Sequence, residues 1–268
     1  MINNLKFNQK LWLITALLSL LVSFTGLINQ NIYAKVVNRE ILPGVISQDL
    51  ITLIISIFLI YISLSVKKKD IKDQIIAVSF LAYIFYAYSV YSIEQLYNSY
   101  YLFYLLLASL SFWSIVLALA NYDNCYIKEI NLSKYIYYLT ITFLILIPLL
   151  FYLLWGSQLL VLMKSGVKQE FTFSIYILDL IFVLPAMLIT AVMLIKKNIF
   201  AYITAPVLFF KAFTLLFSVA IGSFLRPIYD ISFSAGEAFF YLILSISFLT
   251  LALLNFKKLE IKAVKKIT

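Results

Sequence analysis

Histidine is absent from this chain of 268 residues, and Cys125 is the single cysteine. A chain without histidine cannot supply a haem–His ligand, a His-ligated metal or a Ser-His-Asp triad. One cysteine allows no disulfide framework within the chain and argues against a thiolate metal site. The sequence therefore indicates no metal and no cofactor.

Glycine and acidic residues are also scarce, with 6 Gly and 12 Asp or Glu against 21 Lys or Arg. There is no Gly-rich phosphate loop, no G-x-S-x-G elbow and no H-E-x-x-H motif. No basic face interleaved with aromatic residues indicates nucleic acid as a partner. The chain thus lacks a positive signature of an enzyme, although a carboxylate and a lysine acting on lipid stay open as an alternative.

Long apolar runs dominate the sequence, which is 64% hydrophobic and 12% charged, where soluble proteins carry about 25% charged residues. Runs of roughly 20 residues can cross a hydrocarbon layer about 30 Å thick as helices. They are too long and too uniformly apolar for barrel strands. The sequence predicts an all-α bundle of about eight spans in the lipid bilayer. The expected spans cover residues 11–27, 47–66, 75–91, 100–120, 135–155, 173–195, 200–224 and 235–256.

No soluble domain is expected, because the longest connections, 30–46 and 156–172, are too short to fold alone. Residues 1–268 therefore form a single transmembrane domain. Asp49 and Asp179 each open a span that ends in a lysine pair. This weak repeat favours two four-helix halves, 1–120 and 135–256, in the same orientation, as in some transporters. Chance similarity between apolar segments is the alternative.

Basic residues are distributed unevenly between the two sets of connections. Fifteen lie before the first span, in alternate connections or after the last span, and five lie in the other connections. The positive-inside rule then predicts that both termini are cytoplasmic, in the plasma membrane. The first span resembles a signal peptide in part, but its length and the seven spans after it favour an uncleaved helix.

Two charges fall inside predicted spans, where a lysine near the centre costs roughly 2.5–3.5 kcal/mol. Lys211 lies about 17 Å from the inner end of its span, and Asp179 about 9 Å from the outer end of the preceding one. Because a short connection makes these spans antiparallel neighbours, we expect an Asp179–Lys211 ion pair inside the bundle.

Further polar residues cluster toward the same outer side. Asp49 and Glu237 lie near the outer ends of their spans, and Tyr83 and Tyr86 lie deeper than the tyrosines of the interface belt. The candidate ligand-binding residues are Asp49, Asp179, Lys211, Glu237, Tyr83 and Tyr86. Pairing that only fixes helix register is the structural alternative. Pro185 and Pro206, close to Asp179 and Lys211, are predicted helix kinks.

Several segments resemble a family of uncharacterised multi-pass membrane proteins of bacteria and archaea. They are QDLITL at 48–53, YIFYAY at 83–88, YNSYYLFYLLLASLSFW at 97–113, LDLIFVLPAML at 178–188 and YITAPVLFFKAFTL at 202–215. The resemblance implies that Asp49, Asp179, Pro206 and Lys211 belong to the family pattern. This chain departs from that pattern at residues 57–59, which lack the family's proline. The family supplies a topology and no activity.

The leading hypothesis from sequence is a protein that binds or transports a small solute or ion through an outward-facing polar pocket. A second is a structural or accessory subunit, with a membrane protein partner or a second copy of the chain. A third is a lipid-modifying enzyme. The sequence leans against enzymatic activity and predicts no cofactor.

Overall fold

The computed structural model describes residues 2–67, 70–122, 129–130, 132–257 and 259–260. Cys125 lies outside these residues, as do several lysines that were used to predict the topology: Lys68, Lys69, Lys128, Lys258, Lys262, Lys265 and Lys266. The described residues contain eight helical spans that are long and apolar enough to cross a membrane. The prediction of an all-α, multi-pass transmembrane bundle is therefore confirmed.

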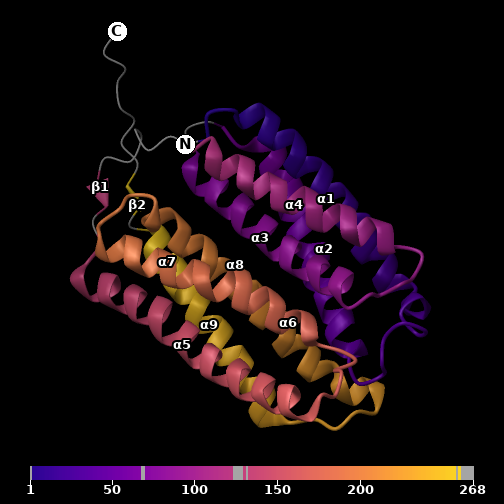
Figure 1. Ribbon diagram of the computed structural model, residues 1–268. Coiled ribbons are helices and arrows are strands. Elements are labelled where there is room, and N and C mark those ends of the chain that lie inside the picture. Colours follow the sequence, from indigo (N-terminus) through magenta and orange to yellow (C-terminus); the bar gives the residue numbers. More distant parts are fainter. Residues whose placement is uncertain (1, 68–69, 123–128, 131, 258, 261–268) are drawn as a thin grey trace.

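The first four spans are single helices, grouped on one side of the bundle in Figure 1. They are α1 (Leu5–Ile28), α2 (Leu42–Ser65), α3 (Ile71–Ile93) and α4 (Tyr101–Ala120). The short helix η1 (Gln30–Ile32) follows α1. Helix α1 packs on α2 and α4, and α3 packs on α4. A core that includes Trp12, Leu59 and Tyr88 fills this group.

The remaining elements form the other side of the bundle in Figure 1. They are α5 (Lys134–Ser165), α6 (Phe173–Leu178), the π-helix η3 (Asp179–Val183), α7 (Leu184–Ile195), α8 (Ala201–Leu225), the 3-10 helix η4 (Arg226–Tyr229) and α9 (Ala235–Lys257). Helix α8 packs on α9 and also on α2 and α3, so it joins the two sides. A second core, centred on Phe209 and Phe248, lies among α5, α7, α8 and α9. Whether the two sides are a true repeat stays a prediction.

The start of the chain and the end of α9 lie at the same end of the bundle (Figure 1). There Ile2 bridges Tyr122 after α4, and the two-residue strands β1 (Glu129–Ile130) and β2 (Leu259–Glu260) pair antiparallel. An even number of spans requires this arrangement. The structure does not assign this end to the cytoplasm, so the orientation stays a prediction.

Helix α5 is longer than the apolar run that predicted it, which stopped at residue 155. The helix continues to Ser165, so residues 156–165 are not part of a connection. Gly156, Ser157 and Gln158 made the apolar run look finished, but none of them ends the helix. The actual stop is Gly166, which has a φ of 65° and ends the helix in the left-handed conformation that favours glycine.

Candidate functional site

A cavity of ≈ 250 Å³ lies where the two sides of the bundle meet. Six spans contribute to it, namely α2, α3, α5, the span formed by α6, η3 and α7, α8 and α9, and its wall is mostly apolar. We call it the inner cavity. Its polar and aromatic members are Gln48, Tyr86, Phe151, Trp155, Asp179, Lys211, Tyr241 and Phe248. Three of the residues predicted from sequence, Tyr86, Asp179 and Lys211, therefore line one space.

Asp179 is held at this cavity by an irregular stretch of helix. It begins the π-helix η3, in which the Leu184 N–H donates to the Asp179 carbonyl, five residues back. Pro185 follows directly, and because proline has no N–H it cannot complete the regular α pattern there. π turns are uncommon and often occur at functional sites. The helix is therefore irregular just before Pro185. A kink at Pro185 stays a prediction.

The Asp179 carboxylate accepts two hydrogen bonds from aromatic side chains. The Tyr86 hydroxyl donates to Oδ1 at 3.1 Å, and the Trp155 indole Nε1 donates to Oδ2 at 3.1 Å. Asp179 is 8% exposed, so these bonds replace most of its contact with water. They link α3 and α5 to the π-helix across the cavity. Both carboxylate oxygens therefore have neutral donors.

Lys211 projects from α8 into the same space but is bonded differently. Its Nζ lies 3.8 Å from the centroid of the Tyr86 ring, a cation–π contact, and the residue is 4% exposed. Among the described residues no side chain or carbonyl accepts a hydrogen bond from its ammonium. Three N–H donors thus lie inside the bundle without a hydrogen-bond acceptor among the described residues, with the Tyr86 ring in contact and the Asp179 charge acting on them from a greater distance.

The predicted direct ion pair between Asp179 and Lys211 is wrong at contact distance. Within the described ranges the ion pair shorter than 4.0 Å is Arg39–Asp230, which is exposed at the surface. Tyr86 separates the two buried charges, since its ring lies under the ammonium and its hydroxyl bonds the carboxylate. Depth along each helix placed both residues in one region, but it could not show that a tyrosine from α3 fills the gap.

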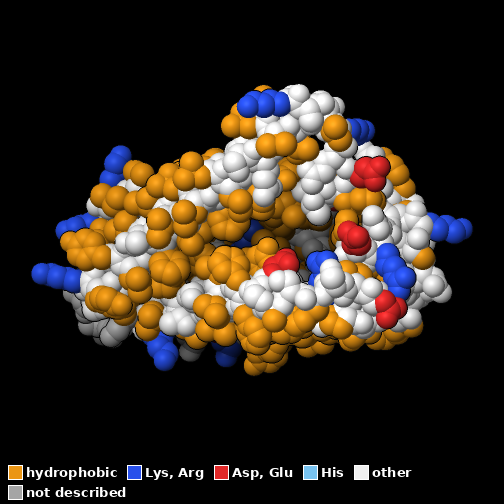
Figure 2. Space-filling view, turned by 90° about the horizontal axis from the view of Figure 1, so that it is seen from below, with side chains coloured by type: hydrophobic (Ala, Val, Ile, Leu, Met, Phe, Trp, Pro, Cys, Tyr) orange, Lys and Arg blue, Asp and Glu red, His pale blue; other side chains and the backbone are white. Residues whose placement is uncertain are grey.

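A second cavity, of ≈ 310 Å³, adjoins the first on the side of the α1–α2, α3–α4 and α8–α9 connections. We call it the outer cavity. Its charged members are Glu40, Glu94, Arg226 and Glu237. The two cavities share part of their walls: Gln48, Val90, Ile175, Leu215 and Val219. They are therefore adjoining parts of one hollow. The face shown in Figure 2 is hollowed, with acidic side chains gathered beside the opening.

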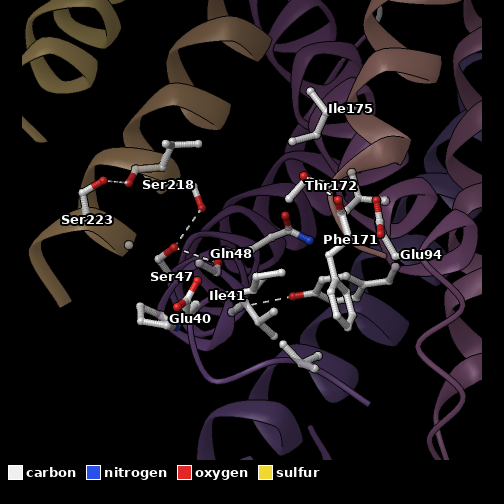
Figure 3. Close-up of a pocket in the computed structure, with 18 of the residues that line it drawn as sticks. Glu40, Ile41, Ser47, Gln48, Glu94, Phe171, Thr172, Ile175, Ser218 and Ser223 are labelled. Atoms are coloured by element: carbon white, nitrogen blue, oxygen red, sulfur yellow. Dashed lines mark hydrogen bonds between the residues drawn. The ribbon is translucent and has the colours of Figure 1, made fainter. Parts of the chain in front are cut away.

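Figure 3 shows how the outer cavity is divided. Ser47, Ser218 and Ser223 lie on one side, and Glu94, Phe171 and Thr172 lie on the other, with Gln48 between them. Ser47 Oγ and Ser218 Oγ are 3.4 Å apart and tie α2 to α8.

Glu94 caps the end of α3 and bonds to the start of α6. Its Oε1 accepts the Ser174 N–H at 2.8 Å. Its Oε2 is buried and has no hydrogen-bond partner in the part of the chain that is described. Glu237, the predicted member of this group, is exposed in the first turn of α9 and lines the outer cavity only.

Asp49 lies apart from both cavities, on the face of α2 that packs against α1. It is 1% exposed, and its carboxylate accepts hydrogen bonds from Tyr33 at 2.6 Å and from Tyr91 at 3.3 Å. Gly26 of α1 lies against the same carboxylate. Burial and the neighbouring Asp49 raise the pKa of the Tyr33 hydroxyl, so it remains a donor to the carboxylate. The structure thus surrounds Asp49 with protein donors and brings it to no cavity.

Tyr83 and Pro206 likewise lie away from both cavity walls. The Tyr83 side chain is fully buried, and its hydroxyl donates to the Gln48 carbonyl at 3.2 Å. Pro206 is buried within α8, one turn before Lys211, and the helix continues through it. Gln48 and Trp155 line the inner cavity but were not selected from sequence. Trp155 is the last residue of the fifth expected span, and the sequence holds no signal that it bonds Asp179.

Tyr33→Phe is expected to lower the stability of the protein because Asp49 would lose its shortest hydrogen bond. A bond to a buried charged group contributes about 1.5–3 kcal/mol. The thermal unfolding midpoint of the detergent-purified protein measures the loss. Tyr229→Phe is a suitable control, since its hydroxyl bonds only the Gln30 side chain, at 2.9 Å, in a partly buried position. Equal midpoints for both variants would contradict a structural role for Asp49.

Eight spans around a buried polar hollow define this chain as a multi-pass membrane protein embedded in a lipid bilayer. Comparison with protein families, with curated proteins and with solved structures finds no match. The resemblance to an uncharacterised membrane protein family therefore remains a prediction from the sequence motifs.

Proposed function

We propose that this protein binds a small solute or ion from outside the cell and carries it through the outer cavity to the inner cavity. The observation that carries the proposal is the placement of Asp179 and Lys211 on the wall of one hollow. Lys211 lies near the middle of its span and Asp179 in the outer half of its own, both buried where ionisable groups are costly and commonly mark solute pathways. The family resemblance singles out the same two residues, and membership in that family is part of the proposal.

The direction of access follows from the distribution of lysines. Connections at the end of the bundle that holds the start of α1 carry most of the basic residues, which places that end in the cytoplasm under the positive-inside rule. The outer cavity lies near the opposite turns, beside Glu94 and Arg226. This topology puts both termini in the cytoplasm of a plasma membrane protein and opens the outer cavity to the exterior.

Ligand binding is expected to raise the unfolding midpoint of the detergent-purified protein by mass action, by about 2.7 kcal/mol of stability at one hundred times the dissociation constant. The panel contains ions, amino acids, sugars, organic acids and lipids. Wild type, Asp179→Asn and Lys211→Met are measured side by side. We expect at least one ligand to shift wild type and to shift neither variant.

Asp230→Asn is the matched control for charge removal. Asp230 is 86% exposed, pairs with Arg39 at the surface and lines neither cavity, so its loss should leave every ligand shift unchanged. A panel in which no compound shifts wild type would contradict solute binding. Early melting of both cavity variants, with a fixed protein partner co-purifying, would then favour the accessory-subunit alternative. Turnover of a labelled lipid lost in Asp179→Asn would favour the enzyme alternative.

A further inference from the structure

The two buried charges of the inner cavity differ in how well the protein satisfies them. Asp179 has a neutral donor on each carboxylate oxygen, Tyr86 on one and Trp155 on the other. Lys211 has the Tyr86 ring under its ammonium and no acceptor for its N–H groups among the described residues. A buried ammonium without acceptors is costly. The N–H donors of Lys211 are therefore complementary to an anionic group.

We propose that the ligand of the inner cavity is an organic anion whose single charged group binds Lys211 and whose apolar body packs against α5 and α9. This inference rests on the proposed function and names its ligand class. An anionic oxygen would accept the free N–H donors of Lys211 in charge-assisted hydrogen bonds. The ring of Tyr86 fixes one side of the ammonium, so the donors that remain are available on the cavity side.

The rest of the cavity wall selects an apolar body. Phe151 from α5, Met187 from α7, Leu216 from α8 and Phe248 from α9 line it, and its exposed wall is mainly carbon. A small inorganic anion would leave this surface uncovered, whereas an alkyl or aryl chain would bury it, at about 25 cal/mol per Å². The wall thus complements a molecule with one charged end and one apolar end, the usual composition of ligand pockets.

The acids of the outer cavity set a limit on the charge of this ligand. Glu40, Glu94 and Glu237 outnumber Arg226 along the path to Lys211, and Asp179 lines the inner cavity with it. A multiply charged anion would meet repulsion there, since the surrounding field steers ligands by charge. A monoanion meets the least repulsion among anions. Two sources share this chemistry, a soluble organic acid and a lipid-derived acid such as a free fatty acid.

The test uses matched probes with the same body and different head groups. Isocaproate, isocaproamide and isoamylamine compare an anionic, a neutral and a cationic head on a short chain, and laurate with lauramide repeats the comparison on a lipid chain. The readouts are the unfolding midpoint and the fluorescence of Trp155, which contacts Asp179 in the cavity. Trp155→Phe identifies the part of the fluorescence change that arises there. The variants are Lys211→Met, Lys211→Arg and, as a control, Lys164→Met on the exposed end of α5.

We expect a carboxylate to bind wild type and Lys164→Met equally, with its amide and amine binding at least tenfold more weakly. Lys211→Met should weaken the carboxylate roughly ten- to hundredfold, the value of a charged hydrogen bond, and Lys211→Arg should restore part of it. Binding of isocaproate identifies a soluble acid, and binding of laurate alone identifies a lipid-derived one.

Two results would overturn this ligand class while leaving the cavity as a binding site. One is an amine or amide that binds as tightly as its carboxylate. The other is a cation or sugar of the wider panel that binds wild type while both carboxylates do not. If no compound of either set shifts wild type, the proposed function itself is wrong.

Discussion

Gly26→Ala will lower the stability of the protein by about 2–5 kcal/mol, the sum expected from overpacking a core and losing a hydrogen bond to a buried charge. A Cβ at Gly26 would overlap Asp49 Oδ2 and would lie 2.5 Å from the Tyr33 hydroxyl oxygen. Neither partner has room to move, since Asp49 is 1% exposed and Tyr33 is fully buried. Relieving the overlap would pull the carboxylate away from Tyr33 and separate α1 from α2.

Thermal unfolding in detergent measures this effect, and the chain supplies a matched control. Gly156 lies within α5, and a Cβ there would meet nothing within 4 Å. Gly156→Ala should therefore leave the midpoint unchanged or raise it slightly, because alanine favours the helix by about 1 kcal/mol. If the two variants unfold at the same temperature, α1 does not pack against Asp49 as described.

Lys211→Met will raise the stability of the ligand-free protein by about 1–3 kcal/mol, although it removes a residue central to the proposed function. Methionine has nearly the length of lysine and needs no hydrogen-bond acceptor, so the cost of burying the ammonium is removed. The opposing cost is the loss of a positive charge near Asp179, and this cost is reduced because the two charges are not in contact. Asp179 would keep both of its bonds, from Tyr86 and Trp155. Such a gain would agree with a functional rather than a structural role for Lys211, since ionisable groups inside spans commonly mark functional sites.

The measurement is the unfolding midpoint without added ligand, with Lys164→Met as the control for losing one positive charge. Lys164 is exposed near the end of α5, so its replacement should change little. A midpoint for Lys211→Met clearly below wild type would show that the ammonium holds the bundle together. In that case the cavity charges are a structural lock, and the accessory-subunit alternative would lead.

Span number and the region that holds Asp179 and Lys211 could be predicted from sequence, because apolar run length and depth along a helix are one-dimensional quantities. The face on which a residue lies could not. Gln48 and Asp49 are adjacent, and about 100° of rotation separates successive residues on a helix. Gln48 consequently lines both cavities, while Asp49 lies against α1. Uniformly apolar spans give no polar stripe from which that rotation could be read.

The contacts of Asp179 also could not be predicted from the sequence. Tyr86 and Trp155 come from α3 and α5, and both bond one carboxylate. Depth placed all three residues in the outer half of the bundle, but the sequence carries no sign of which spans face each other. Trp155 ends the apolar run that predicted its span. The continuation of α5 for a further three turns brings it inside the bundle.

The π turn at Asp179–Val183 leaves the two ends of its span out of phase with each other. One turn there holds an additional residue, so α7 is rotated relative to the path that a regular continuation of α6 would take. Asp179 can thus face Tyr86 while Met187 and Ala191 still face the second core. Deleting a single residue from this turn would restore an unbroken α-helix. Either Asp179 would then turn away from Tyr86, or Met187 and Ala191 would turn away from the second core. The irregular turn is therefore the element that allows one span to serve both a polar hollow and an apolar core.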